Sequence, residues 1–269
     1  MQGVFSLWEE FGEVPHQRGR IPADSSGASP YDLGVRPLGE LLSDEPAWPL
    51  VESWVAEAAN DVRVLPTDRE RGEETLHLLQ VTTRSPLGAV ALETGGLLVD
   101  HGWIRILGAG CETMRSSLAS WNGLHATREI EPIDNALVIA NDAVGGLFAL
   151  NGGAFDGEPG SVFYFAPDTV DWLDTSMGYS GFLQWACTGD IARFYDELRW
   201  EGWERDVAQA SADQGFALYP PPFTKKGKPV GHAHRRPVPI FELCAHYRDY
   251  ARQIAELPEG AAFRIDFKD

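Results

Sequence analysis

Residues 137–165 read LVIANDAVGGLFALNGGAFDGEPGSVFYF, and this stretch decides the expected fold. Its apolar, β-branched and aromatic residues suit a pleated surface with a buried face. The Asn-Asp and Asn-Gly-Gly sequences between them are typical of turns, because these residues tolerate the backbone conformations that turns need. We therefore predict a β-meander of three short strands, residues 137–140, 146–150 and 161–165, at the centre of one domain.

Segments with helical periodicity lie on both sides of this meander. Trp48, Val51, Trp54 and Val55 recur at spacings of three and four, as expected for one face of a helix. Proline, glycine and capping residues mark where such segments begin and end. Helices or helical turns are predicted at residues 37–42, 45–59, 68–79, 85–92, 116–121, 178–186, 189–198, 203–210 and 239–257.

Short apolar runs bounded by turn residues predict further strands at 62–65, 97–99 and 103–107. Residues 167–172 are interpreted as a turn with a short strand or helical piece, and residues 223–237 as a basic loop. Together these elements predict the α+β class, with a small, mostly antiparallel central sheet flanked by helices.

Composition divides the chain into three parts. Residues 15–31 are rich in Pro, Gly, Ser and Arg, and such a segment buries too little apolar surface to offset its ordering entropy. We therefore expect a poorly ordered leader or arm at 1–36, a single α+β domain at 37–257 and a C-terminal tail at 258–269.

The overall composition is that of an ordinary soluble protein, with 43% hydrophobic and 23% charged residues in a chain of 269. No apolar run approaches the ~20 residues of a membrane-spanning helix, and no secretory signal is recognisable. Cys111, Cys187 and Cys244 are widely spaced and odd in number, which favours a reducing compartment over a disulfide framework. We expect a cytoplasmic protein.

The net charge is −18, from 22 Lys and Arg against 40 Asp and Glu. A field of this sign repels nucleic acid and anionic membranes, and it attracts basic proteins or cations. Solubility alone also accounts for such a charge. Residues 223–237 depart from it, with five Lys or Arg and no acid, and they either fold against the acidic body or reach outward.

The Asp100-His101 pair is the first candidate site, in the loop between two predicted strands. Loops carry binding and catalytic residues disproportionately often. The pair is interpreted either as a general base with its orienting carboxylate or as a histidine in a turn. A small-ligand sensor or enzyme would use a concave pocket where Asp100, His101 and Trp103 converge with Asp142 or Asn151.

The remaining polar motifs point to no metal or cofactor. His232 and His234 could supply two metal ligands, but the arginines that follow them disfavour a cation. The glycine-rich residues 108–114 and 152–160 lack the spacing of phosphate-binding loops. We predict no metal site and no cofactor.

Three of the nine tryptophans, Trp172, Trp200 and Trp203, lie at the ends of predicted elements among charged residues. They are interpreted either as the rim of the core or as a protein-binding hot spot, since aromatic anchors are typical of such interfaces. They are the binding candidates of the C-terminal half.

Four long segments carry a family resemblance: DEPAWPLVESWVAEA, LQVTTRSPLGAVALETGGLLVDHGWIRILGAG, NDAVGGLFALNGG and VFYFAPDTVDWLDTSMGYSGFLQWACTGD. Over roughly residues 37–257 the chain resembles an uncharacterised bacterial family, domain of unknown function 2625. That resemblance implies no activity, substrate or catalytic residue.

A more distant similarity involves the order DAVGGLFAL, VFYF and YSGFLQWA, which resembles the core of SUKH-type immunity domains. The similarity implies an α+β fold with a small antiparallel sheet flanked by helices. It also implies binding of toxins, often through acidic surfaces. The longer C-terminal half and the basic residues 223–237 depart from that pattern.

We carry three hypotheses forward. The first is a non-enzymatic, immunity-like module that binds a basic protein, such as a toxin, by electrostatic steering followed by aromatic anchors. The second is a small-ligand sensor or enzyme with a pocket near Asp100, His101 and Trp103. The third is a structural or oligomeric protein.

Overall fold

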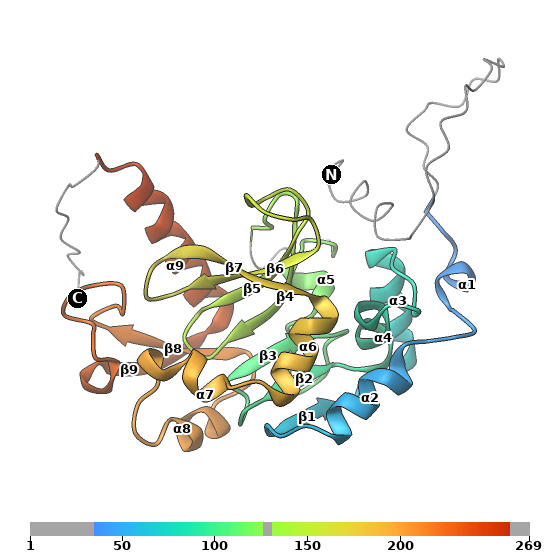
Figure 1. The fold of residues 1–269 in the computed structure, drawn as a ribbon, viewed down its shortest axis with the longest axis horizontal. Helices are drawn as coiled ribbons and strands as arrows, with labels where there is room; N and C mark the ends of the chain where they lie inside the picture. The colour runs from blue at the N-terminus through green and yellow to red at the C-terminus, as the bar shows by residue number, and fades with distance from the viewer. Residues whose placement is uncertain (1–34, 126–130, 259–269) are drawn as a thin grey trace, which may run out of the picture.

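The computed structural model describes residues 35–125 and 131–258. Nearly all of the predicted leader and of the predicted tail therefore lies outside the described residues. Within them, helices surround a seven-stranded antiparallel sheet, which confirms the predicted α+β class (Figure 1).

The seven strands follow one another across the sheet in chain order, each antiparallel to the next. The predicted meander is confirmed as β4, β5 and β6. Within the sheet, the mostly apolar strands β1 to β3 lie on one side of the meander, and β7 lies on the other. The strands are β1 Val62–Leu65, β2 Gly96–Val99, β3 Ile104–Leu107, β4 Ala136–Asp142, β5 Leu147–Asn151, β6 Ser161–Ala166 and β7 Asp171–Gly178.

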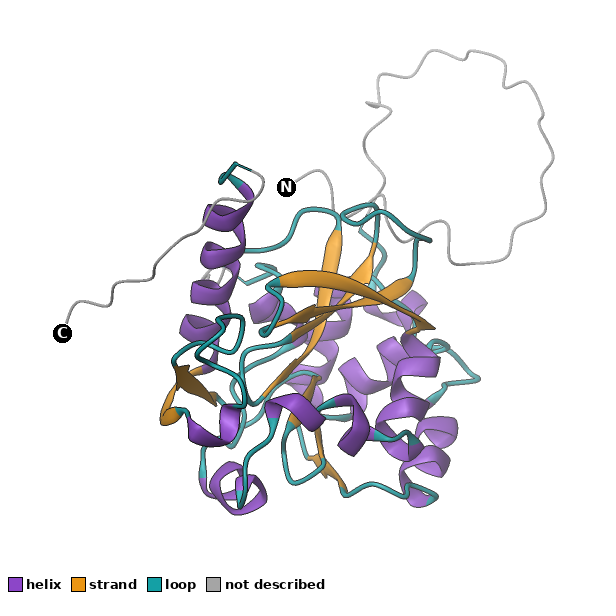
Figure 2. Cartoon of the chain, turned by 60° about the vertical axis from the view of Figure 1, so that its left-hand side comes forward, coloured by secondary structure: helices purple, strands orange, loops and turns teal. Residues whose placement is uncertain are grey.

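Helices occupy both sides of this sheet. Figures 1 and 2 place α2, α3 and α4 on one side and α9 on the other. The helices are α1 Leu38–Leu41, α2 Trp48–Ala56, α3 Arg69–Leu79, α4 Pro86–Glu93, α5 Leu118–Trp121, α6 Tyr179–Thr188, α7 Ile191–Phe194, α8 Trp203–Gln209 and α9 Ile240–Ala255, with short 3-10 turns η2 Asp196–Leu198 and η3 Val230–His232. None of the described helices is long and apolar enough to cross a membrane.

Local sequence explains where several helices begin. The Asp68 side chain accepts a hydrogen bond from the backbone N–H of Arg71 at the start of α3. Ser85 does the same for Gly88 at the start of α4, where Pro86 occupies the first helical position. Both arrangements satisfy a backbone donor that the helix itself leaves free.

The core is built from large side chains on both faces of the sheet. Trp103, Trp121, Phe148, Phe165 and Phe182 are fully buried. Burying side chains of this size supplies most of the hydrophobic driving force of a fold. Phe148 and Phe182 join the meander to α6, with ring centroids 4.8 Å apart.

Two parts of the predicted secondary structure are wrong, and a third was incomplete. The turn and short strand predicted at 167–172 are present, but the strand, β7, continues to Gly178. The helix predicted at 189–198 is divided into the short helix α7 and the 3-10 turn η2. The predicted loop 223–237 contains the start of β9, His234–Pro239, which pairs with an unpredicted strand, β8 Gln214–Tyr219.

Proline explains the last of these differences. Pro237 and Pro239 suggest broken structure, and both lie in β9. A two-stranded ribbon consists entirely of edge strands, where a residue without an N–H is tolerated. In the loop between the two strands, one basic residue folds against the body of the protein: Lys228 lies 3.0 Å from an oxygen of Asp168 and 2.9 Å from one of Glu197.

Candidate functional site

The β2–β3 hairpin turns at Asp100, His101 and Gly102, which have φ angles of 52°, 57° and 87°. Such left-handed backbone is easy for glycine and tolerated by aspartate and histidine. The turn is closed by the N–H of Trp103, which donates to the carbonyl of Asp100 over 2.9 Å. It is also fixed to the neighbouring loop, because the N–H of Asp100 donates to the carbonyl of Asp61.

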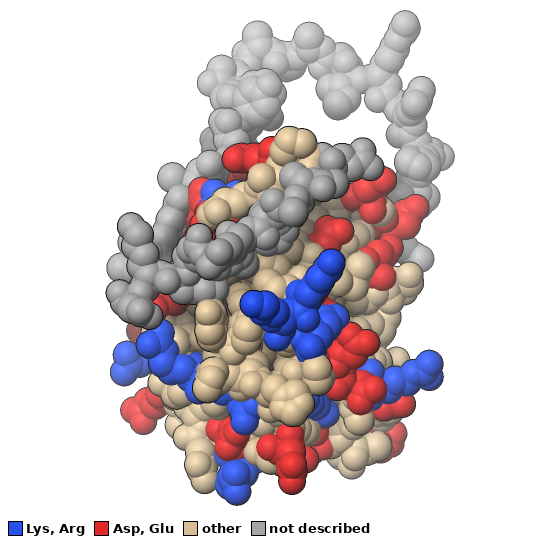
Figure 3. All heavy atoms as spheres, turned by 90° about the vertical axis from the view of Figure 1, so that its left-hand side faces the viewer, with Lys and Arg blue, Asp and Glu red and all other residues tan. Residues whose placement is uncertain are grey.

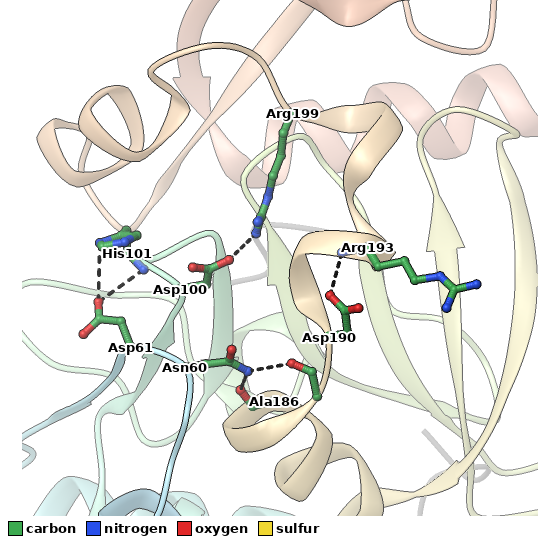
Figure 4. A network of polar contacts seen from close by, with 9 residues as sticks. Asn60, Asp61, Asp100, His101, Ala186, Asp190, Arg193 and Arg199 are labelled. Carbon is green, nitrogen blue, oxygen red and sulfur yellow. Dashed lines mark hydrogen bonds and ion pairs between the residues drawn. The ribbon is translucent and has the colours of Figure 1, made fainter.

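The side chains of Asp100 and His101 have different partners, as Figure 4 shows. Asp100 pairs with the guanidinium of Arg199. The imidazole of His101 lies 3.7 Å from a carboxylate oxygen of Asp61, and both of these side chains are about half exposed. No hydrogen bond joins Asp100 to His101 among the described residues, so the structure does not arrange the two as a carboxylate-oriented base.

Arg199 stands in an aromatic cluster that includes three of the candidate tryptophans, Trp103, Trp200 and Trp203. Its guanidinium carbon lies 3.9 Å from the ring centroid of Trp203 and 4.9 Å from that of Trp103. Trp103 is fully buried and also contacts the rings of Trp200 and Tyr195. Cation–π contacts with an ion pair at one edge stabilise the position of such an arginine.

Asp142 lies on the neighbouring strand, paired with Ile104 next to Trp103, but its side chain has other partners. Asp142 is fully buried at the end of β4, where it accepts hydrogen bonds from the hydroxyl of Tyr164 (2.7 Å) and the backbone N–H groups of Val144 and Gly146. Burial raises the pKa of the Asp142 carboxyl, and these three donors oppose that rise. A side chain at Gly146 would stand 2.1 Å from the Asp142 carboxylate, so only glycine fits.

Asn151 and Trp172 lie toward the glycine-rich loop between β5 and β6, away from Asp142. The Asn151 side chain donates to the carbonyls of Phe155 and Gly157 and accepts from the N–H of Gly153, which holds the glycine-rich loop together. Trp172 stacks near Phe155, with ring centroids 4.4 Å apart. Asn151 pairs with Ala136 at the far end of β4 from Asp142, so these candidates do not converge.

A pocket of about 330 Å³ lies beside the candidate turn. The sheet forms one wall, and the end of α8 with the chain after it forms the other. Its lining residues are Arg63, Leu98, His101, Gly102 and Arg105 on the sheet side, Glu112 and Thr113 in the loop after β3, and Val207, Ala208, Ala210, Ser211 and Ala212 opposite.

A row of residues crosses four adjacent strands, and its first three members, Arg63, Leu98 and Arg105, line the pocket. Arg63 pairs with Leu98, Leu98 with Arg105, and Arg105 with Asn141. Residues paired directly across strands share one face of a sheet. The row therefore runs from Arg63, which is exposed, to Arg105 and Asn141, which are buried.

Arg105 is the most unusual residue of this row. It is 1% exposed, and its guanidinium donates no hydrogen bond to any described residue; Nε and Nη1 are completely enclosed. Burial lowers the pKa of Arg105 to about 10, against the opposing effect of the Asp142 charge. Both polar atoms of the Asn141 side chain likewise have no partner in the described part of the chain.

Sequence analysis missed Arg105 and Asn141. The signal was present in the run Ile104–Leu107, IRIL, where a single arginine interrupts a fully buried strand. Buried arginine is rare unless it is paired. The contact with Asn141 depends on strand register, which local sequence does not display.

The two walls of the pocket are tied together. The carboxylate of Asp213 accepts hydrogen bonds from the backbone N–H groups of Arg115 (2.8 Å) and Ser116 (2.9 Å). The segment after α8 is therefore fixed to the loop after β3, and the pocket is a formed feature of the fold.

No group of three or more His, Cys, Asp or Glu side chains suited to a metal occurs in the described ranges. The three cysteines are free and buried. Burial raises the pKa of the Cys187 and Cys244 thiols, which disfavours the reactive thiolate.

The sequence comparisons identify the family. The model of the protein of unknown function DUF2625 matches residues 38–243, and the chain belongs to this family. It is 41% identical over 187 residues to the uncharacterised protein YbfG of Escherichia coli (strain K12), covering 69% of this chain and 85% of the relative. An uncharacterised protein of Haemophilus influenzae is 36% identical over 187 residues, covering 69% and 82%.

No solved structure matches the chain. The predicted family is thus confirmed, and neither relative's name states an activity. The SUKH-like similarity stays a prediction.

Proposed function

We propose that this protein is a small-ligand-binding module, such as a sensor, that uses the pocket beside the β2–β3 turn. One observation carries the proposal: a buried arginine without a hydrogen-bond partner in the described chain lines a formed pocket. An enclosed charge without a partner costs several kcal/mol, and such local conflicts between stability and structure are typical of functional sites.

The lining favours binding over catalysis. His101 is the candidate general base in the lining, and the carboxylate oxygen of Asp61 is 3.7 Å from its imidazole, with both side chains about half exposed. A general base is normally oriented by a close hydrogen bond. The small and apolar side chains of Val207, Ala208 and Ala210 offer a surface for a ligand rather than a reacting group.

A pocket-filling variant tests this proposal. Ala210→Trp places a large side chain in the lining, and Ala192→Trp, at an exposed position of α7, is the matched control. A set of small metabolites is tested by thermal shift against the wild type and both variants. We expect compounds that raise the Tm of the wild type and of Ala192→Trp but not of Ala210→Trp. If every stabilising compound acts equally on all three proteins, the pocket is not the binding site.

The net charge of −18 favours a second candidate function, the binding of a basic protein. On the face shown in Figure 3, Lys and Arg side chains form a group beside acidic ones. Lys228 is already paired with Asp168 and Glu197, so part of the basic segment acts as an internal counter-charge.

This second candidate, an immunity-like role in the cytoplasm, makes a genetic and a biochemical prediction. A gene for a basic toxin should adjoin the gene of this protein. The purified toxin should bind it with an affinity that falls steeply as salt is added. Binding that does not respond to salt, or no binding at all, contradicts this candidate.

A further inference from the structure

We propose that the ligand of this pocket carries one carboxylate group, which the guanidinium of Arg105 holds, and a small apolar body. This inference rests on the proposed function and adds the chemical class of the ligand. It follows from four features of the pocket: the enclosed cation, its polar neighbour, the charges at the mouth and the apolar wall.

The enclosed cation requires an anion. The Nε and Nη1 atoms of Arg105, which carry three of its five N–H donors, are enclosed without a hydrogen-bond partner in the described chain. Asp142 is the acid that attracts it most strongly, but the hydrogen-bonded partners of that carboxylate are Tyr164, Val144 and Gly146. A planar guanidinium with unused donors matches a carboxylate, which accepts two parallel hydrogen bonds.

Asn141 is a second buried polar group next to the lining residue Arg105. It is the direct cross-strand neighbour of Arg105, fully buried, with its amide N–H₂ and its carbonyl oxygen both unused in the described chain. An amide beside a guanidinium supplies a further donor for the second oxygen of a carboxylate. A ligand that fills these contacts would satisfy the polar atoms of both residues.

The charges around the pocket favour a single negative charge. Arg63 lies exposed at the mouth, where it attracts an anion toward a site in an otherwise acidic protein. Glu112 also lines the pocket and opposes an excess of negative charge. A phosphate monoester carries a charge of about −1.5 to −2 at pH 7, more than one enclosed guanidinium offsets.

Most of the remaining lining residues are apolar or glycine, with Thr113 and Ser211 as the polar exceptions. Leu98 faces the side chains of Val207, Ala208, Ala210 and Ala212 across the pocket. With about 330 Å³ available, the cavity is at the lower end of the range for small-molecule sites. A short aliphatic or single-ring acid fits this space, with its body against the alanines.

The test uses matched charged and neutral probes on the full chain. Butanoate and benzoate are titrated by calorimetry and thermal shift, and butanamide and benzamide serve as neutral isosteres. Inorganic phosphate is the third type of probe. The variants are Arg105→Met, Arg105→Lys and, as a control, Arg84→Met, at an exposed position outside the lining. Circular dichroism establishes that each variant is folded.

We expect at least one of the two carboxylates to bind, with at least about tenfold higher affinity than its amide. Arg105→Met should lose this preference, Arg105→Lys should weaken it because a lysine cannot form the two-pronged contact, and Arg84→Met should leave it unchanged. Should Arg105→Met fail to fold, the lysine variant alone decides.

Other outcomes overturn the inference. Equal binding of acid and amide, abolished by Ala210→Trp, would leave the proposed function in place and refute the carboxylate. Binding of phosphate alone would also refute it. If the carboxylates bind but respond equally to Arg105→Met and Arg84→Met, Arg105 is not the recognising group. If no probe distinguishes the wild type from Ala210→Trp, the inference and the proposed function both fail.

Discussion

Arg105 and Arg199 are both enclosed arginines beside the β2–β3 hairpin, and their surroundings are opposite. Arg199, with its side chain 10% exposed, pairs with Asp100 and lies 3.9 Å above the ring of Trp203, although its Nε has no partner in the described chain. Arg105, 1% exposed, has neither a hydrogen bond nor a cation–π contact among the described residues.

The difference separates two roles for the same residue type. The contacts of Arg199 stabilise the fold, because they join the turn at Asp100 to the segment before α8. The environment of Arg105 opposes its charge, since burial outweighs the attraction of Asp142 and lowers its pKa to about 10. One arginine holds the structure together, and the other is retained at a cost to stability.

Arg199→Met should produce the largest loss of stability. It removes the cation–π contacts and leaves the carboxylate of Asp100, 19% exposed, without its partner. Breaking an enclosed ion pair by removing one side typically costs about 3 kcal/mol or more. Urea unfolding measures the loss of stability, with Arg193→Met as the control because the Arg193 side chain points away from the network in Figure 4. A loss of stability no greater than that of the control would show that the contacts of Arg199 do not stabilise the fold.

Tyr164→Phe should cost about 2 kcal/mol at neutral pH, because it removes a hydroxyl donor to a buried carboxylate. Tyr179→Phe is the control, since the buried hydroxyl of Tyr179 has no partner in the described chain. The free energy of unfolding of Tyr179→Phe should equal that of the wild type or exceed it.

The pH dependence of this loss follows from Asp142. Its pKa is raised in the folded state, so the favourable contribution of its protonated form is full below the ordinary value of 3.8 and declines as pH rises through the folded pKa. The Tyr164 hydroxyl lowers that pKa, so Tyr164→Phe raises it further. The stability gap between wild type and variant should therefore widen as pH rises. A gap that narrows would contradict the assigned hydrogen bond.

Arg63→Gln should weaken butanoate or benzoate binding about threefold at low salt and less at high salt, because Arg63 is exposed and acts by attraction at the mouth. Calorimetry at two salt concentrations measures this, with Arg84→Gln as the control. An effect as large as that of Arg105→Met would place the anion at the mouth and not at the buried end of the row.

Lys228→Met should have the smallest effect. The Lys228 ammonium lowers the pKa of the Glu197 carboxyl by donating a hydrogen bond to it. The ionised carboxylate therefore contributes stability above its ordinary pKa, and this contribution is lost as pH falls. The variant should raise the pKa of Glu197, as measured by NMR titration, with little change in Tm because both groups are solvated. Lys226→Met, an exposed control, should leave Glu197 unchanged; an equal response would show that the pair does not persist in solution.

Much of the fold could be predicted from local sequence. β1 begins and ends where its apolar run predicts, and the meander of β4, β5 and β6 follows from its turn residues. The ribbon of β8 and β9 was missed because Pro237 and Pro239 are compatible with a strand only where no neighbour needs their N–H.

Less of the candidate site could be predicted. The turn at Asp100 and His101 was recognisable from its flanking strands, and the pocket does lie beside it. The partner of Asp100, however, is 99 residues away, and the pairing of Arg105 with Asn141 depends on strand register. Contacts between distant segments leave no periodic or compositional signal.

The most direct test of the central claim is the free energy of unfolding of Arg105→Met without ligand, measured by urea titration beside Arg199→Met. If Arg105 is retained for a ligand, replacing its enclosed charge with an apolar side chain of similar length should leave stability unchanged or raise it by about 1–3 kcal/mol. A loss of about 3 kcal/mol, equal to that expected for Arg199→Met, would show that Arg105 stabilises the fold and would contradict the account.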